Sequence, residues 1–202
     1  MTKIAPSQHP IHDLVQQRWS PRSFAERPIE PEKLLCLLEA ARWAPSSSNE
    51  QPWAFIVATK EDPAEFERAL ACLNDNNQRW AKSAPVLMFS LTKKQFTRNE
   101  RPNRFAFHDL GLAVANLLAQ ATAFDLYVHQ IGGIQVDKVR ETYQIPETHD
   151  IGAGIAIGYL GDLEQLPDDL QERERAERQR KPLNEFVFSG SWGQPAPWLE
   201  AD

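Results

Sequence analysis

The side chains of this sequence that are best suited to chemistry lie where a predicted helix meets a predicted strand. The segment ARWAPSSSNEQPWAFIV, residues 41–57, places a run of hydroxyl and amide groups between two prolines: Ser46, Ser47, Ser48, Asn49 and Gln51. Such side chains hydrogen-bond nearby backbone in caps and turns, which explains one or two of them. Four in succession favour a second interpretation, a polar wall beside a flat heterocycle.

A second polar group stands near the N-terminus, in RWSPRSF. Arg18 and Arg22 flank the hydroxyl of Ser20. Guanidinium groups bind phosphate oxygens in pairs, and a serine hydroxyl adds a further donor. These residues fit either an anion site or a surface turn with two solvated arginines, and the sequence leaves both open.

Three further patterns also have two explanations each. Asn76 and Arg79 are three residues apart, so they share one face if their segment is helical. A glycine pair, Gly132 and Gly133, follows a predicted strand and is either a turn or a place where bare backbone N–H groups meet a ligand. The basic run RQRKP at 178–182 is more typical of a solvated face than of a site.

Other common kinds of catalytic site have little support. The sequence has no GxSxG or GxxxxGK[ST], and the glycines of GAGIAIG have the wrong spacing for a dinucleotide-binding loop. His9 and His12 stand beside Pro10 with no third ligand nearby, which disfavours zinc. His108 precedes Asp109 in a long apolar helix, so we expect a hydrogen-bonded histidine in the core there.

Length and composition fit one globular domain, expected over residues 1–202. A net charge of -6 argues against nucleic-acid and anionic-membrane partners. The two cysteines, Cys36 and Cys72, are too few for a disulfide framework, which suits a reducing compartment. No uncharged run reaches the roughly 18 residues of a membrane span. We therefore expect a cytoplasmic protein.

Helical and strand patterns alternate unevenly along the chain. The predicted helices are 31–44, 63–84 with an interruption, 103–124 and 135–145, and the predicted strands are 53–59, 85–91, 126–134 and 152–161. Residues 168–181 alternate in charge, which is typical of a solvated helix or an extended arm, and the tail 182–202 needs another surface to pack on. The uneven connections favour an α+β layered fold over a regular βαβ series.

In this order, the motifs resemble the nitroreductase family of FMN-dependent oxidoreductases. RWSPRSF resembles that family's Arg-x-Ser-x-Arg/Lys element, and AARWAPSSSNEQPWAFIV resembles its Ala-Pro-Ser-x-x-Asn-x-Gln-Pro-Trp segment. KSAPVLMF, DLYVHQIGGI, AIGYLGD and RKPLNEFV follow in the expected succession, so the likeness covers about residues 18–187. The resemblance implies an obligate homodimer with FMN at the subunit interface. It also implies a central, mostly antiparallel sheet flanked by helices, with each C-terminal extension adding to the partner's sheet.

The resemblance further implies which residues bind the cofactor. The FMN phosphate and ribityl chain would contact Arg18, Ser20, Arg178 and Arg180. The pyrimidine edge of the ring would contact Arg22, Asn76 and Arg79. Backbone amides of Gly132 and Gly133 would face flavin N5 and O4, and Ser46, Ser47 and Asn49 would reach in from the partner. Neighbours in the same motifs complete the cofactor-binding set: Trp19, Pro45, Gln130 and Ile131.

The implied reaction is a ping-pong hydride transfer that needs no catalytic side chain. NADH or NADPH would reduce FMN at N5, and a small electron-poor aromatic, such as a nitroaromatic or quinone, would then be reduced in the same pocket. The alternatives are a dehydrogenating or dehalogenating enzyme with the same cofactor, a flavin-binding protein without turnover, or a dimeric scaffold without a cofactor. The sequence has no discriminator between NADH and NADPH, and it does not identify the acceptor. The basic segment TKKQFTRNERPN, 92–103, favours a solvated loop over a substrate lid.

Overall fold

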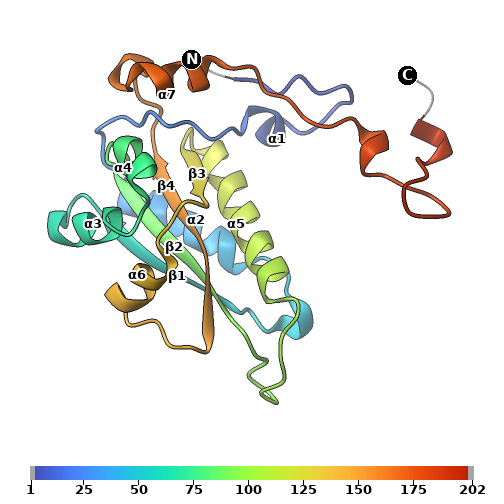
Figure 1. Cartoon of the computed structure of the whole chain (residues 1–202), viewed down its shortest axis with the longest axis horizontal. Helices are drawn as coiled ribbons and strands as arrows, with labels where there is room; N and C mark the ends of the chain where they lie inside the picture. Colours follow the sequence, from blue (N-terminus) through green and yellow to red (C-terminus); the bar gives the residue numbers. More distant parts are fainter. Residues whose placement is uncertain (1–2, 200–202) are drawn as a thin grey trace.

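A four-stranded antiparallel sheet forms the centre of the computed structural model, which describes residues 3–199. The strands have the spatial order β1-β2-β4-β3 (Figure 1), and they are β1 (Trp53–Thr59), β2 (Val86–Lys93), β3 (Tyr127–Ile131) and β4 (His149–Gly158). All the strand pairings are antiparallel, which confirms the expected α+β fold. The single unit expected over 1–202 also includes residues 1–2 and 200–202, which lie outside the described residues.

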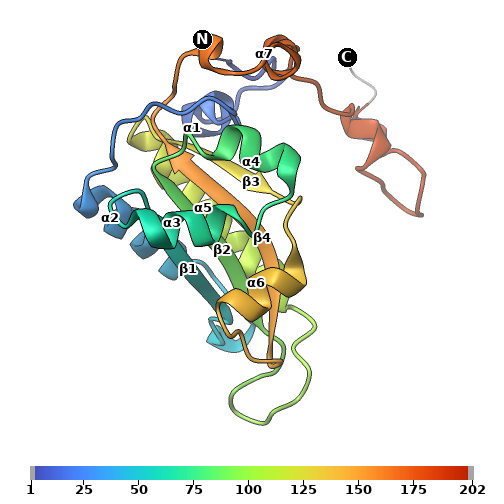
Figure 2. The ribbon, with the colours of Figure 1, turned by 60° about the vertical axis from the view of Figure 1, so that its left-hand side comes forward.

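Helices cover both faces of the sheet (Figure 2). One face carries α2 (Pro31–Arg42) and α5 (Ala106–Ala123), and the other carries α3 (Pro63–Leu70), α4 (Asp75–Ala81) and α6 (Val136–Thr142). Strand β2 serves both layers. Val86 and Met88 pack in the α2–α5 cluster, whereas Leu87 and Phe89 pack in the opposite one. Successive side chains of a strand point to opposite faces, so the continuous apolar run of β2 follows from its burial on both sides.

The sequence patterns locate most elements, and the differences have local causes. The strand predicted at 53–59 is β1. Helix α2 ends at Arg42, before the predicted residue 44, because the chain must leave the helix ahead of Pro45. The predicted interruption within 63–84 is confirmed, since α3 ends at Leu70 and α4 begins at Asp75. Residues 168–181 combine both expectations, because α7 (Asp168–Arg175) is followed by an extended arm.

The solvated loop expected at 92–103 folds back on itself as a short hairpin. Gln95 forms an isolated bridge with Pro102, and Phe96 N donates to Arg101 O at 2.9 Å. Glu50 Oε1 accepts from Thr97 N at 2.7 Å, which ties this hairpin to the serine-rich segment.

The two terminal regions cross one end of the sheet side by side. The N-terminal segment contains α1 (Asp13–Gln17) and lies next to α7 and the root of the C-terminal arm (Figures 1 and 2). Beyond this point the arm projects from the body and exposes Trp192 and Trp198, whose exposed fractions are 92% and 70%. Among residues 3–199, no helix is long and apolar enough to cross a membrane.

Candidate active site

The N-terminal Arg-x-Ser element lies beside the root of the C-terminal arm. Arg18 Nη1 donates to Ser20 Oγ at 3.2 Å, so the guanidinium and the hydroxyl point to the same place. Trp19 between them is buried and meets the ring of Tyr127 edge to face at 6.0 Å between centroids. Trp19 therefore anchors this segment to the core, while the side chains of Arg18 and Ser20 remain partly accessible to solvent.

Arg178 joins the arm to this element. Its Nη1 donates to Lys3 O at 2.8 Å and Gln16 O at 3.1 Å, and its Nη2 donates to Arg18 O at 2.8 Å. A guanidinium has five N–H donors and these bonds use three, so Arg178 still has donors for a ligand. Arg178 is thus a structural tie as well as a candidate ligand contact.

Arg18, Arg178 and Arg180 form a cationic cluster. Burial, together with the neighbouring charges of Arg178 and Arg180, lowers the pKa of Arg18. Within the described residues, none of these arginines forms an ion pair with a carboxylate. They edge a cavity of about 950 Å³ whose apolar wall includes Ile11, Val15 and Phe186. Guanidiniums gathered without acidic partners are chemically suited to a phosphate group.

The glycine pair follows the end of β3. Neither Gly132 N nor Gly133 N donates to an acceptor within residues 3–199, whereas Gly133 O accepts from Asn74 N at 3.0 Å and Asn77 Nδ2 at 3.0 Å. A Cβ on Gly133 would stand 2.3 Å from Asn77 Nδ2, while a Cβ on Gly132 would meet nothing within 4 Å. Both backbone donors are therefore without an acceptor in this part of the chain, and open space lies beside Gly132. Its neighbours in β3 differ, since Ile131 is buried in the core and Gln130 is exposed.

The remaining predicted cations are paired with acids of α7. Arg79, on α4, makes a bidentate ion pair with Asp169 at 3.0 and 2.7 Å. Arg22 donates to Glu174 through its backbone N at 2.7 Å and its Nη1 at 3.2 Å. Asn76, on the same helix as Arg79, is exposed to solvent. Sequence reasoning missed both acids, because they lie 90 and 152 residues from their arginines and no spacing rule connects them.

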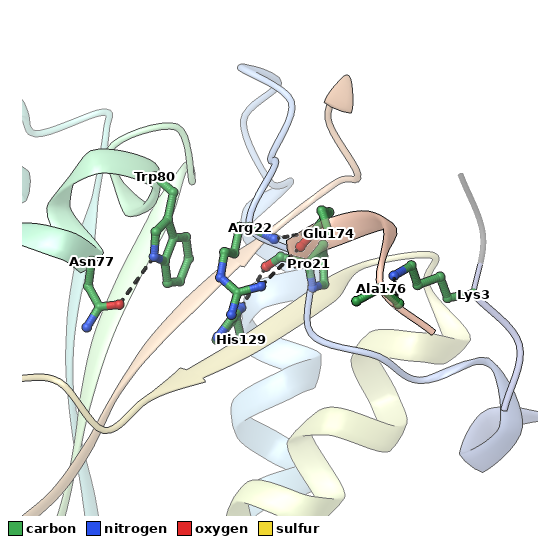
Figure 3. A network of polar contacts seen from close by, with 8 residues as sticks. All are labelled: Lys3, Pro21, Arg22, Asn77, Trp80, His129, Glu174 and Ala176. Carbon is green, nitrogen blue, oxygen red and sulfur yellow. Dashed lines mark hydrogen bonds and ion pairs between the residues drawn. The ribbon is translucent and has the colours of Figure 1, made fainter. Parts of the chain in front are cut away.

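A histidine of β3, His129, lies between the Arg22 segment and Trp80 of α4 (Figure 3). His129 Nδ1 hydrogen-bonds Pro21 O at 2.8 Å, and its ring packs on Trp80 with centroids 4.5 Å apart. Trp80 Nε1 donates to Asn77 Oδ1 at 3.2 Å, and Asn77 in turn holds Gly133 O. Burial lowers the pKa of His129 to about 4, with the charges of Arg22 and Arg18 acting in the same direction. His129 is therefore neutral near pH 7 and serves as a spacer in this network.

The serine-rich segment forms a 3₁₀ turn, Ser47–Asn49, with Ser48 and Asn49 at positive φ values of 56° and 54°. Ser46 Oγ accepts from Gln51 N at 3.0 Å, so part of the polar run does hydrogen-bond its own turn. Pro45 is exposed at the start of this segment. The side chains of Ser47 and Asn49 make no side-chain hydrogen bond within the described residues. They remain available to a ligand.

Asp109 holds this turn in place. Its carboxylate is buried, and its Oδ2 accepts from Ser47 N at 3.0 Å. The expectation of a core histidine at His108 is wrong: the His108 side chain is 68% exposed, and the buried residue is Asp109. The helical phase of α5 explains this, because Asp109 shares the buried face with Ala106, Leu110 and Ala113 whereas His108 faces outward.

The serine turn and the arginine cluster lie at opposite ends of α5 (Figure 1). Ser47 contacts Asp109 in the first turn of α5, whereas Arg18 and Trp19 line a hollow with Leu118 and Thr122 near its other end. At about 1.5 Å per residue, Asp109 and Thr122 are separated by about 20 Å along the axis. One copy of the chain therefore places the arginine cluster and the serine turn in different regions. In the described part of the chain, no group of three or more His, Cys, Asp or Glu residues could hold a metal ion.

Comparisons with known proteins agree with this architecture. A solved structure described as an oxidoreductase containing FMN superposes with a TM-score of 0.87 and 39% identity, over 93% of this chain and 96% of that one. An "Uncharacterized 15.4 kDa protein in ask 5'region" of Mycolicibacterium smegmatis is 32% identical, over 62% of this chain and 84% of its own length. The "Major NAD(P)H-flavin oxidoreductase" of Aliivibrio fischeri is 32% identical, over 46% of this chain and 43% of its own length. The model of the Nitroreductase family matches residues 15–159, and the chain belongs to that family.

Proposed function

We propose that this protein is an FMN-dependent NAD(P)H oxidoreductase that works as a homodimer. The observation that carries the proposal is the cationic cluster of Arg18, Arg178 and Arg180, which has no carboxylate partner within the described residues. Ser20 adds a hydroxyl at 3.2 Å from Arg18. This donor set fits a phosphate monoester such as that of FMN, since charge-assisted hydrogen bonds to phosphate oxygens would offset the mutual repulsion of the arginines.

The donors around the glycine pair fit the ring of FMN. Two backbone N–H groups, at Gly132 and Gly133, have no acceptor within residues 3–199, and such donors suit the N5 and O4 edge. Arg22, Asn76 and Arg79 supply guanidinium and amide groups for the pyrimidine edge. When bound, FMN supplies a ring that accepts a hydride from NAD(P)H and passes it to an electron-poor acceptor, for which we propose nitroaromatics or quinones.

The chain's own residues have binding and electrostatic roles in this reaction. A guanidinium at the pyrimidine edge stabilises negative charge there and, with its very high pKa, does not readily donate its proton. The glycine amides orient the ring edge without covering it. No nucleophile is required, so no Ser, Cys or His is assigned a catalytic role.

A second copy of the chain would complete the site. The side chains of Ser46, Ser47 and Asn49 lie at the far end of α5 from the arginine cluster, so they would reach the cofactor of the partner. Exposed apolar side chains lie near both groups of residues. Phe107, at the start of α5 near the serine turn, is 54% exposed, and Phe186, on the arm near the arginine cluster, is 56% exposed. Burial of such groups in a subunit interface would be favourable, and the arm would add to the partner's sheet.

The proposal is tested by titrating purified apoprotein with FMN and then mixing the complex anaerobically with NADH or NADPH. We expect stoichiometric FMN binding, bleaching of the yellow colour by at least one nicotinamide, and reoxidation by a nitroaromatic or a quinone. Sedimentation should give a dimer. Binding without bleaching would indicate a flavin-binding protein without turnover, and failure to bind FMN would refute the proposal.

A further inference from the structure

Both guanidiniums assigned to the pyrimidine edge are neutralised by carboxylates of one helix. Arg22 pairs with Glu174 at 3.2 Å, and Arg79 pairs with Asp169 at 2.7 Å. Both acids belong to α7, a helix of eight residues. Figure 3 shows Glu174 reaching from α7 toward Arg22, with His129 of β3 beside that guanidinium.

The two ion pairs differ in their surroundings. The Glu174 side chain is only 6% exposed and accepts from both the backbone N and the Nη1 of Arg22. A buried carboxylate is costly unless it is paired and hydrogen-bonded, so Glu174 must remain with Arg22 in the folded protein. The Arg79–Asp169 pair is open to solvent, with side-chain exposures of 42% and 53%. Its electrostatic effect on a neighbouring group is therefore reduced by water and salt.

We propose that α7 sets the net charge at the ring edge, and that Glu174 and Asp169 thereby lower the reduction potential of the bound flavin. This inference rests on the proposed FMN function. The carboxylates act through Arg22 and Arg79, so both are positioning and charge-compensating residues. Reduction places negative charge at the pyrimidine edge, which an uncompensated guanidinium would stabilise strongly. A carboxylate on the same guanidinium removes much of that stabilisation, and it does so most effectively where it is buried.

A low potential would have a chemical use. A flavin that is not over-stabilised in its reduced state passes its electrons more readily to an acceptor. The acids of α7 would thus favour the second half of the reaction at the expense of the first.

The test compares Glu174→Gln and Asp169→Asn with Glu172→Gln, a control on the same helix whose side chain is exposed and makes no ion pair within residues 3–199. The midpoint potential of bound FMN is measured by equilibration with a reference dye during slow anaerobic reduction. We expect Glu174→Gln to raise the preference for reduced over oxidised FMN about tenfold, which for a two-electron couple is about 30 mV. Asp169→Asn should give about a twofold rise at low salt, and this rise should diminish in high salt. Glu172→Gln should leave the potential unchanged.

A purely structural role predicts different results. Glu174→Asp retains the negative charge, so it should keep the wild-type potential even if it lowers the free energy of unfolding. Unchanged potentials in both Glu174→Gln and Asp169→Asn would overturn the inference, as would an equal rise in Glu172→Gln. If Glu174→Gln does not fold, the salt-dependent shift of Asp169→Asn decides the question. Failure of the wild-type protein to bind FMN would refute the proposed function instead, before any potential is measured.

Discussion

The carboxylate of Asp109, buried in the first turn of α5, accepts a hydrogen bond at 3.0 Å from the backbone N of Ser47. This contact spans 62 residues and attaches the serine-rich turn to the helix that underlies it. The turn holds Ser48 and Asn49 at positive φ, which is uncommon for residues other than glycine, although asparagine adopts it more readily than most. Asp109 therefore helps to maintain the conformation in which the hydroxyl and amide groups of the turn are presented.

Replacement of Asp109 by alanine should destabilise the protein by about 1–3 kcal/mol, because Ser47 N would lose its acceptor in a poorly solvated place. Urea unfolding measures this change. The matched control is His108→Gln, which removes the exposed neighbour that contacts the same carboxylate but leaves the Ser47 bond intact. Equal losses in the two variants would show that the Asp109–Ser47 bond is not the important contact.

The fold was accessible from the sequence because local patterns were consistent with it. The apolar runs at 53–59 and 85–91 predict the strands β1 and β2, and Pro45 marks the end of α2 within a few residues. The sequence predicts less well which side of α5 each residue faces. Placing His108 in the core of the protein was wrong by one residue, because its neighbour Asp109 occupies the buried face.

The ion pairs of the site could not be predicted in this way. Arg22 and Arg79 stood out as candidate ligand contacts, but Glu174 and Asp169 lay in a segment of alternating charge that looked like any solvated helix. Only the placement of α7 beside both Arg22 and Arg79 of α4 brings these acids to the arginines. Long-range pairing of this kind depends on topology and leaves no local signal in one sequence.

The two arginines of the arm should separate structural from ligand-binding roles. Arg178→Ala should lower the free energy of unfolding by about 1–3 kcal/mol, since three hydrogen bonds to backbone carbonyls are lost. Arg180 is exposed and, within residues 3–199, its side chain bonds only Gln179 O, so Arg180→Ala should leave stability nearly unchanged. It should weaken FMN binding about tenfold while leaving riboflavin binding unaffected, because riboflavin has no phosphate. Parallel loss of both ligands would argue against a phosphate contact at Arg180.

The glycine pair offers a second matched comparison. Gly133→Ala would place a Cβ 2.3 Å from Asn77 Nδ2 and should break the bond from Asn77 to Gly133 O. We expect lower stability, by about 1–3 kcal/mol, and weaker FMN binding. Gly132→Ala meets no protein atom within 4 Å and should preserve the stability of the apoprotein. Thermal unfolding of the apoprotein and FMN titration measure the two effects, and a larger loss in Gly132→Ala would reverse the assignment of the crowded position.

His129 should make the stability of the apoprotein depend on pH in the acid range. Its pKa is lowered by burial from an unfolded value of about 6.5 to about 4 in the folded protein. Between these values the unfolded chain binds the proton and the folded protein does not, so stability is complete above pH 6.5 and falls as the pH drops toward 4. The loss is up to about 3 kcal/mol, reduced to the extent that the ring keeps contact with water.

Urea unfolding at several pH values, combined with an NMR titration of the imidazole, measures this dependence. Gln is the informative replacement, because its amide can still donate to Pro21 O but does not titrate. His129→Gln should therefore match the wild-type stability near pH 7 and show a flatter profile between pH 6.5 and pH 4. If the imidazole of the folded wild-type protein titrated near pH 6.5, the prediction would be contradicted. Burial of the ring against Trp80 should disfavour its charged form and so keep its pKa low.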